Sequence, residues 1–346
     1  MATNQSMTIY DISKMAGVSI ATVSRAMNSV TQDVVAPTTR NRIAALADKH
    51  GYTPSLAARA LSGSALKTIG VLLPQSPGVF FHHYYQQIMA GVADELLETE
   101  YQFKLILAKP GERRWDRYNF KSGEAVDGLI VTHRHTFFSR VAVFDRLQLP
   151  CVVINDPEPG VKAYFVSGDH VMGGHLAARH LYAKGHRRVA VLTGPNDSSD
   201  SRLRLRGFRQ FFHQAGRRVE LTVLPGGEFQ EERARQVAAD FLKTKPSVTA
   251  FFCCNDEMAL GVLRQLRAMR RSCPKDYSLI GYDDHPRTRT SDPPLTTIRV
   301  PLYEMAKTAA RRLVEHLTAG QREQAFQGVT LLPVELVERQ SVRRHR

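Results

Sequence analysis

Side chains rich in hydrogen-bonding groups stand directly after several apolar runs of the sequence. The pairs Asn155-Asp156, Asn255-Asp256 and Asp283-Asp284 each follow such a run, and Arg202 and Arg204 follow another after a short loop. An amide offers a donor and an acceptor, a carboxylate offers acceptors, and a guanidinium offers a planar fork of donors. Taken singly, Asn and Asp are ordinary turn and cap residues. Their joint placement predicts a site for a polyhydroxylated molecule such as a sugar. The aromatic side chains that could pack on the face of its ring are Tyr84, Tyr85 and Phe229.

The apolar runs themselves predict the framework of that site. From residue 68 onward, short continuous runs such as 69–73, 128–131 and 250–254 alternate with segments of helical spacing. Continuous runs are typical of parallel strands that are covered on both faces. Two such series, one on each side of residue 167, predict two similar α/β lobes with parallel sheets. Ligands of such sheets bind beyond the carboxyl ends of the strands, so we expect the site in the cleft between the lobes.

Residues 8–28 predict two short helices joined by a tight turn. Ile9, Ile12 and Ala16 recur at helical intervals on one face of the first helix. Gly17 stands where a left-handed cap is needed, and Ser19 can cap the second helix. A helix-turn-helix places the first residues of its second helix against the base edges of DNA. An ordinary helical hairpin with a solvated face is the alternative. The side chains that we expect to point outward are Ile20, Ala21, Thr22, Ser24 and Arg25.

Composition and charge limit the class of protein. The 346 residues carry a net charge of +14, and residues 1–67 hold only seven Lys or Arg and three Asp. The excess suits DNA or an acidic ligand, and it also serves solubility. The four cysteines have no zinc spacing, and no phosphate-loop, metalloprotease or nucleophile-elbow pattern is present. The absence of these motifs leads us to expect a protein that is not an enzyme and needs no metal or cofactor. The sequence also has no membrane-length apolar run and no signal region, so we expect a cytoplasmic protein.

Longer motifs are specific to one family. They are Tyr10-Asp11-Ile12, Ala16-Gly17-Val18-Ser19, Thr22-Val23-Ser24-Arg25, Gly51-Tyr52-x-Pro54, Ala57-Ala58-Arg59-Ala60-Leu61, Arg204-x-x-Gly207-Phe208, Asn255-Asp256-x-Met258-Ala259 and Gly281-Tyr282-Asp283-Asp284. Over essentially its whole length the chain resembles bacterial transcription repressors of the lac-repressor/gal-repressor (LacI/GalR) family. The resemblance implies an N-terminal three-helix helix-turn-helix head over residues 1–54, a hinge helix and linker over 55–67, and an effector-binding core over 68–346.

The resemblance also implies the layout of the core. It predicts two lobes like those of periplasmic binding proteins, joined by three crossovers, so that each lobe is discontinuous in sequence. We expect the N-lobe over about 68–166 and 300–328, and the C-lobe over about 167–299 and 329–340.

Individual residues of the head and hinge acquire roles from the resemblance. Ile20, Ala21 and Arg25 stand at base-reading positions, and Leu61 matches a hinge leucine that enters the minor groove of a bent operator. A plain linker helix is the alternative for the segment around Leu61. Thr22, Ser24 and Asn28 stand near phosphates, and the other residues expected at DNA are Thr8, Tyr10, Ser19, Thr39 and Ala58.

In the core, the resemblance implies that Arg204, Asn255 and Asp283 hydrogen-bond the effector and that Phe229 contacts a sugar. Asn155 stands where a member of the family has an aspartate, so an amide replaces a carboxylate at that position. Tyr84 and Tyr85 complete the expected effector set. His82 and His83 belong to a first loop that is longer than in most members, and we expect them as surface residues that border the cleft.

We therefore expect a homodimeric repressor. We expect a dimer rather than a tetramer, because no C-terminal leucine heptads that could join two dimers follow the core. Two heads would read two half-sites of a near-palindromic operator. A sugar or sugar derivative bound between the lobes would shift them, melt the hinge helices and weaken operator binding. A corepressor of opposite sense and an anionic effector, such as a sugar phosphate or sugar acid, are alternatives. A periplasmic transport receptor lacks support without a signal region, and the adjacent carboxylates of Asp283 and Asp284 diverge too far to hydrolyse a glycosidic bond.

Overall fold

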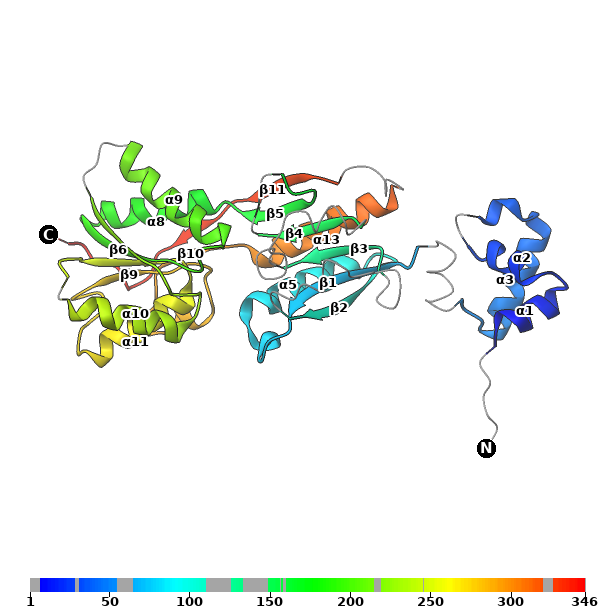
Figure 1. The fold of residues 1–346 in the computed structure, drawn as a ribbon, viewed down its shortest axis with the longest axis horizontal. Helices are drawn as coiled ribbons and strands as arrows, with labels where there is room; N and C mark the ends of the chain where they lie inside the picture. Colours follow the sequence, from blue (N-terminus) through cyan, green and yellow to red (C-terminus); the bar gives the residue numbers. More distant parts are fainter. Residues whose placement is uncertain are drawn as a thin grey trace, which may run out of the picture.

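The computed structural model describes residues 7–28, 31–54, 65–109, 126–132, 149–155, 157, 160–214, 219–244, 246–319 and 326–345. They form a small helical head and a core of two α/β lobes (Figure 1). The predicted fold class, a helix-turn-helix head and a two-lobed core with parallel sheets, is confirmed. Ala58 and Leu61, which were expected at DNA, lie outside the described residues.

The head packs two short helices, α1 (Ile9–Ala16) and α2 (Ile20–Ala26), against the longer α3 (Pro37–His50). The side chains of Ile12, Val23 and Ile43 are fully buried at the centre of this bundle. A single 3-10 turn, η1 (Gln32–Val34), precedes α3. The turn between α1 and α2 has the predicted chemistry, because Gly17 adopts φ 63° and the Ser19 hydroxyl accepts a hydrogen bond from the Thr22 amide.

The first lobe is built on a six-stranded parallel sheet with strand order β11-β5-β4-β3-β1-β2. Two helices, α5 (His83–Leu96) and α13 (Leu302–Thr318), pack against each other, and α13 also contacts β3, β4 and β5. A 3-10 turn, η2 (Val79–Phe81), leads into α5. The strands are β1 (Thr68–Pro74), β2 (Gln102–Ala108), β3 (Gly128–Val131), β4 (Cys151–Ile154), β5 (Tyr164–Gly168) and β11 (Gly328–Leu332).

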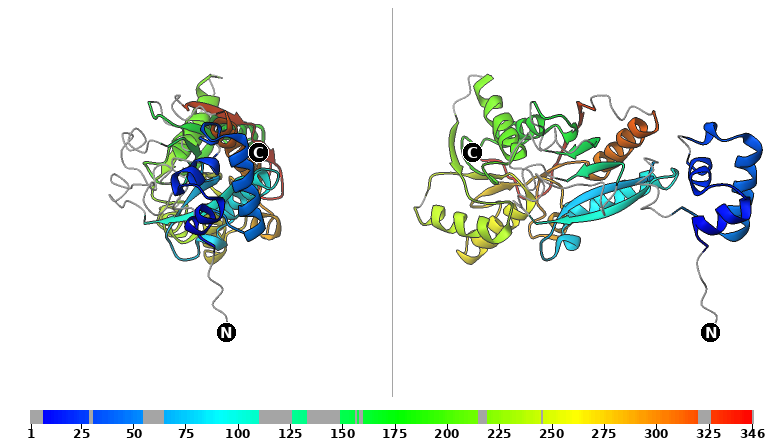
Figure 2. Two further views of the ribbon diagram at one scale, coloured as in Figure 1. Left: turned by 90° about the vertical axis from the view of Figure 1, so that its right-hand side faces the viewer. Right: turned by 45° about the vertical axis from the view of Figure 1, so that its right-hand side comes forward.

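The second lobe has a four-stranded parallel sheet of order β7-β6-β8-β9 with helices on both faces (Figures 1 and 2). One face carries the tightly packed pair α8 and α9, and the other carries α10 and α11. The strands are β6 (Arg188–Leu192), β7 (Glu220–Leu224), β8 (Ala250–Cys253) and β9 (Ser278–Ile280). The helices are α8 (His170–Ala183), α9 (Ser199–Gln214), α10 (Glu231–Lys243), α11 (Asp256–Ala268) and α12 (Arg287–Thr290).

Three crossings join the lobes: from β5 to α8, from β10 (Thr297–Arg299) to α13, and from β11 to β12 (Glu335–Val337). β10 and β12 pair as an antiparallel ribbon. The expected lobe boundary needs a correction here, because residues 329–332 were assigned to the C-lobe. They belong to β11, which pairs in parallel with β5 and therefore completes the N-lobe sheet. Residues 167 and 168 likewise end β5 rather than open the C-lobe.

Candidate functional sites

The structure gathers most of the predicted effector residues where the two lobes meet. Tyr84 and Asn155 come from the first lobe, and the Asn155 amide nitrogen lies 3.3 Å from the Tyr84 hydroxyl. From the second lobe come Arg204 on α9, Asn255 at the N-cap of α11, Phe229 in the loop after β7, and Asp283 after β9. Tyr85 lies next to this group. Its ring meets that of Tyr84 edge-on, with the two ring centroids 5.1 Å apart.

Arg204 is the buried cation of the group, with 5% of its surface exposed. Its guanidinium pairs with the Asp283 carboxylate at 3.6 Å, donates to the Cys254 carbonyl and lies over the Tyr282 ring at 4.0 Å. Burial alone would lower the pKa of Arg204, but the charge of Asp283 holds that pKa above its ordinary value. Arg204 therefore stays charged and can donate to a ligand oxygen.

Burial acts on the pKa of the Asp283 carboxyl in the opposite direction. Burial raises the pKa of its carboxyl to about 7, against the lowering effect of Arg204, and the negative charges of Asp200 and Glu257 add to the rise. This carboxyl is thus divided between its neutral and charged forms near neutral pH. A ligand hydroxyl that donates to it favours the charged form.

Backbone strain concentrates at the same place. Asn155, Phe229 and Asp283 all have positive φ, at 63°, 56° and 108°. Asn and Asp tolerate this region better than other residues, but a phenylalanine there is costly. The turn holds the Phe229 ring against Gly194, where a Cβ atom would come within 2.4 Å of the ring. The strained turns therefore set the directions in which these three side chains leave the backbone.

Sequence reasoning missed the residue that links the two halves of the site. His170 is buried at the start of α8, and its Nε2 lies 3.1 Å from the Asn155 side-chain oxygen and 3.4 Å from Asp200. Its Nδ1 lies 3.1 Å from the Tyr282 hydroxyl and 3.4 Å from Arg204 Nε, which donates to it. Because Nδ1 accepts from Arg204, the proton of the neutral ring is on Nε2 and points to Asn155 and Asp200. No motif of the sequence includes His170, because its partners are distant in the sequence and meet it only in the folded core.

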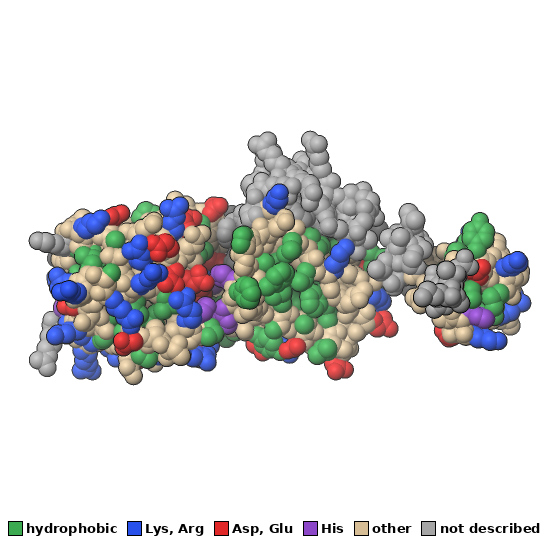
Figure 3. All heavy atoms as spheres, turned by 90° about the horizontal axis from the view of Figure 1, so that it is seen from below, with side chains coloured by type: hydrophobic (Ala, Val, Ile, Leu, Met, Phe, Trp, Pro, Cys, Tyr) green, Lys and Arg blue, Asp and Glu red, His purple; other side chains and the backbone are tan. Residues whose placement is uncertain are grey.

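Histidines also contact the opposite lobe at the surface of the junction between the lobes, where they gather in the space-filling view (Figure 3). His82 of the first lobe lies 3.3 Å from Glu257 of the second, and the rings of His83 and His285 meet at 5.0 Å. Burial lowers the pKa of His285 to about 4, and the positive charge of nearby groups adds to this, so its ring is neutral at pH 7. His82 and His83 were expected only to border the cleft, whereas they contact the opposite lobe.

Helix α2, which the sequence predicts to read DNA, presents the expected side chains at the surface of the head. Arg25 and Ala21 are exposed, and Ile20 is half-buried. The Ser19 and Thr22 hydroxyls lie 2.9 Å apart. Of the flanking residues, Thr8 caps α1, Tyr10 is 72% exposed, and Ser24 and Thr39 are half-buried. Asn28 is 5% exposed, although an accessible position was expected for a residue near phosphates.

Comparison with known proteins agrees with this arrangement. The profile of the family described as bacterial regulatory proteins, lacI family, matches residues 8–55, and that of a periplasmic binding protein-like domain matches residues 178–342. The chain is 31% identical over 333 residues to the HTH-type transcriptional regulator CelR of Thermobifida fusca, covering 95% of each chain. It is 30% identical over 338 residues to the HTH-type transcriptional repressor PurR of Photobacterium profundum, covering 97% of this chain and 98% of PurR.

Solved structures show the same likeness. The lac repressor dimer bound to operator and the anti-inducer ONPF has a TM-score of 0.75 at 27% identity, covering 98% of this chain and 100% of the repressor. A CelR–cellobiose complex has a TM-score of 0.70 at 29% identity, covering 97% of this chain and 99% of CelR.

A helix-turn-helix head on a two-lobed effector-binding core defines a ligand-responsive DNA-binding regulator. The chain belongs to the lacI family of bacterial regulatory proteins and is a transcriptional regulator, not an enzyme. Among the described residues, no group of three or more His, Cys, Asp or Glu is arranged to hold a metal ion. In the same part of the chain, no helix is both long and apolar enough to cross a membrane.

Replacing His170 with leucine is expected to destabilise the core, because buried hydrogen-bonding groups on Asn155 and Tyr282 lose their partner. We expect the free energy of unfolding to fall by about 1–3 kcal/mol, measured by urea denaturation. His170→Gln should recover part of the loss, because an amide keeps a donor and an acceptor. His213→Leu, at an exposed position of α9, is the control and should have little effect. Equal stability of His170→Leu and the unchanged protein would contradict the linking role.

Proposed function

We propose that this regulator is a repressor whose affinity for its operator is lowered by a neutral sugar bound between the two lobes. The observation that carries the proposal is the charge balance around Arg204. Its guanidinium is paired with Asp283, and Asp200 lies on the far side of His170. A sugar phosphate or sugar acid would have to displace Asp283 from Arg204 and then face Asp200 and Glu257, whose charges already act on the site. Hydroxyl groups can instead donate to the carboxylates and accept from Arg204 and the amides.

The relatives support the choice of a sugar. The solved structures with the same fold include CelR in complex with cellobiose and a LacI-family regulator of Enterococcus faecium with bound ribose. In this chain, Phe229 and Tyr84 come from opposite lobes, so each can cover one side of a ring that is held between them. Sugar binding would then bias the relative position of the lobes. A coupling between ligand and operator of about 1–3 kcal/mol is usual for such switches.

The partner at DNA is double-stranded operator. Ile20 and Ala21 offer only apolar contacts, such as to a thymine methyl group, and Arg25 can donate two bonds to a guanine. Thr22 and Ser24 supply hydroxyl groups that can donate to phosphates. This combination favours an operator that differs from those read by polar side chains at the same positions.

A second copy of the chain is the other expected partner. The first lobe exposes an apolar face along its edge strand β2 and the neighbouring η2 and α5, where hydrophobic side chains gather on the surface (Figure 3). Such a contiguous patch is typical of an interface. Its exposed members are Phe80 (45%), Phe81 (86%), Leu97 (76%), Leu105 (37%) and Leu107 (42%). A symmetric dimer through this face places two heads on two half-sites.

Arg25→Ala is expected to weaken sequence-specific operator binding and to leave effector binding intact, because Arg25 lies on the exposed side of α2 and outside the core. Loss of a bidentate guanine contact costs about 1–3 kcal/mol, or roughly 5- to 150-fold in affinity. Gel shifts against the operator measure this effect, and Lys49→Ala at the end of α3 serves as the control. An unchanged footprint would refute the reading role.

Asp283→Ala is expected to remove the response to the effector while operator binding persists. A thermal-shift screen of neutral sugars, sugar phosphates and sugar acids first identifies the ligand.

Because the pKa of Asp283 is about 7 and a hydroxyl donor favours its charged form, affinity for a neutral sugar should rise as pH increases from about 6 to 8. The pH dependence should disappear in Asp283→Asn. Asp240→Ala, on exposed α10, is the control. Normal induction of Asp283→Ala would place the ligand elsewhere, and a rise in operator affinity with ligand would identify a corepressor instead.

Leu105→Glu is expected to weaken the dimer, because it places a charge at the centre of the apolar face on β2. Light scattering over a dilution series should show monomers at concentrations where the unchanged protein is dimeric. Lys104→Glu, the neighbouring exposed position that points to the opposite side of the strand, is the matched control. A Leu105→Glu protein as dimeric as the unchanged one would assign the interface to another surface.

A further inference from the structure

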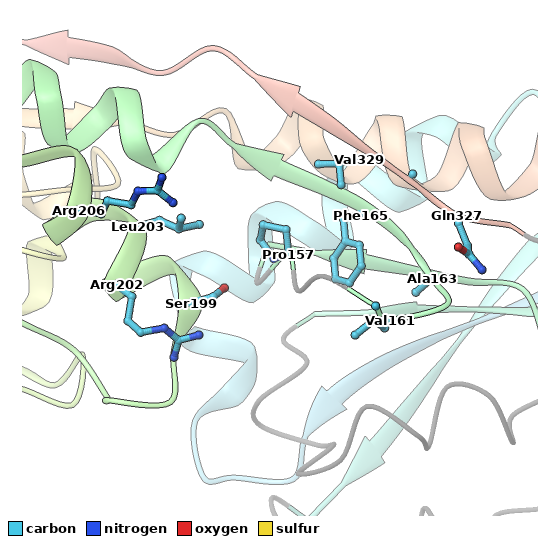
Figure 4. Close-up of a pocket in the computed structure, with 12 residues that line it drawn as sticks. Pro157, Val161, Ala163, Phe165, Ser199, Arg202, Leu203, Arg206, Gln327 and Val329 are labelled. Atoms are coloured by element: carbon cyan, nitrogen blue, oxygen red, sulfur yellow. The ribbon is translucent and has the colours of Figure 1, made fainter. Parts of the chain in front are cut away.

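A cavity lies on the other side of α9 from the Arg204 side chain and has a volume of about 680 Å³. Figure 4 shows α9 of the second lobe on one side and the β5–β11 edge of the first lobe on the other. This volume falls within the range of roughly 300–1,000 Å³ that is usual for small-molecule sites. The cavity is therefore large enough for a ligand that touches both lobes.

Helical geometry separates this cavity from the effector site. Ser199, Leu203 and Arg206 are spaced by four and three residues, so they share one face of α9, and all three line the cavity. Arg204 follows Leu203 by one residue and points to the other face, where it meets Asp283. The described residues that line the cavity include none of Arg204, Asn255 and Asp283. One face of α9 therefore borders the cavity, and the opposite face carries Arg204, which pairs with Asp283.

The floor of the cavity is apolar. Phe165 and Val161 of the first lobe are 2% and 6% exposed, and Leu203 closes the floor from α9. Val329, on the edge strand β11, forms a wall and keeps 54% of its surface exposed. An apolar side chain that remains so exposed beside a concave surface is typical of a binding site rather than of a sealed core.

The rim of the cavity is positively charged. Arg202 and Arg206, one turn apart on α9, are both exposed at its edge. Arg202 also donates to the Asn196 carbonyl at 3.0 Å, which holds that side chain in place. None of the described residues that line the cavity is acidic. An apolar floor beside two guanidinium groups favours a ligand with an apolar body and one anionic head.

We propose that this cavity is a second ligand site, for a small aromatic phosphate or carboxylate. Its body would lie on Phe165 and Val329, and its anionic group would pair with Arg202 and Arg206. Such a ligand would hold the β5–β11 edge against α9, the helix that carries Arg204. It would thus act on the same movement of the lobes as the effector, and by linkage each ligand would change the affinity for the other by the same factor.

Titration calorimetry with phenyl phosphate, inorganic phosphate and benzyl alcohol tests the proposal on the full-length protein. Phenyl phosphate should bind with one site per chain, and the other two probes at least about tenfold more weakly, because each supplies only half of the contacts. Arg206→Gln should weaken phenyl phosphate by about tenfold, as expected for one charge-assisted hydrogen bond. Val329→Glu should do the same by placing a like charge on the wall.

Arg233→Gln, on the exposed surface of α10, is the matched control and should bind phenyl phosphate as the unchanged protein does. Circular dichroism confirms that each variant is folded. Equal binding of phenyl phosphate by Arg206→Gln, Val329→Glu and the control would overturn the proposal, as would equal binding of phenyl phosphate and inorganic phosphate. The absence of saturable binding of phenyl phosphate would overturn it as well. None of these outcomes depends on the effector at Arg204, so the sugar site and this cavity are tested separately.

Discussion

Arg204 carries a permanent positive charge into the junction of the two lobes, and the surrounding structure is arranged to hold it there. A buried charge without partners would cost several kcal/mol, and real proteins avoid that cost with opposing charges and hydrogen bonds. Asp283 supplies the opposing charge, the Cys254 carbonyl accepts a hydrogen bond, and the Tyr282 ring lies beneath the guanidinium. These partners follow strands β8 and β9, so the order of the second sheet decides the geometry of the site.

The same charge connects the second lobe to the first. Arg204 donates to His170, and His170 reaches the Asn155 side chain of the first lobe. Asn155 in turn contacts Tyr84, whose hydroxyl donates to the Thr132 carbonyl at 2.7 Å. A ligand that takes hydrogen bonds from Arg204 or Asp283 therefore alters a continuous set of contacts that spans both lobes. In the proposed function, this set of contacts couples a bound small molecule to the relative position of the lobes.

Two further contacts connect the lobes at the surface of their junction. His82 contacts Glu257 and His83 contacts His285, while β10 and β12 pair as a ribbon at the crossings. The lobes are thus in contact at several points, and the proposed ligand would act by favouring some of these contacts over others. The proposed cavity beside α9 adds a further place where both lobes meet, on the opposite face of the helix that bears Arg204.

The sequence by itself determined the elements and the kinds of side chain at their ends. The glycine turn of the head, the continuous apolar strands and the polar residues after them are local patterns, and local patterns follow from backbone and hydrogen-bonding preferences within a few residues. The two series of apolar runs predicted the two lobes, and the family motifs added the roles proposed for Arg204, Asn255 and Asp283. Only the tertiary structure decided which distant groups meet. Strand β11 joined β5 because edge pairing depends on the whole sheet, and His170 became the link between lobes because its partners stand between 15 and 112 residues away.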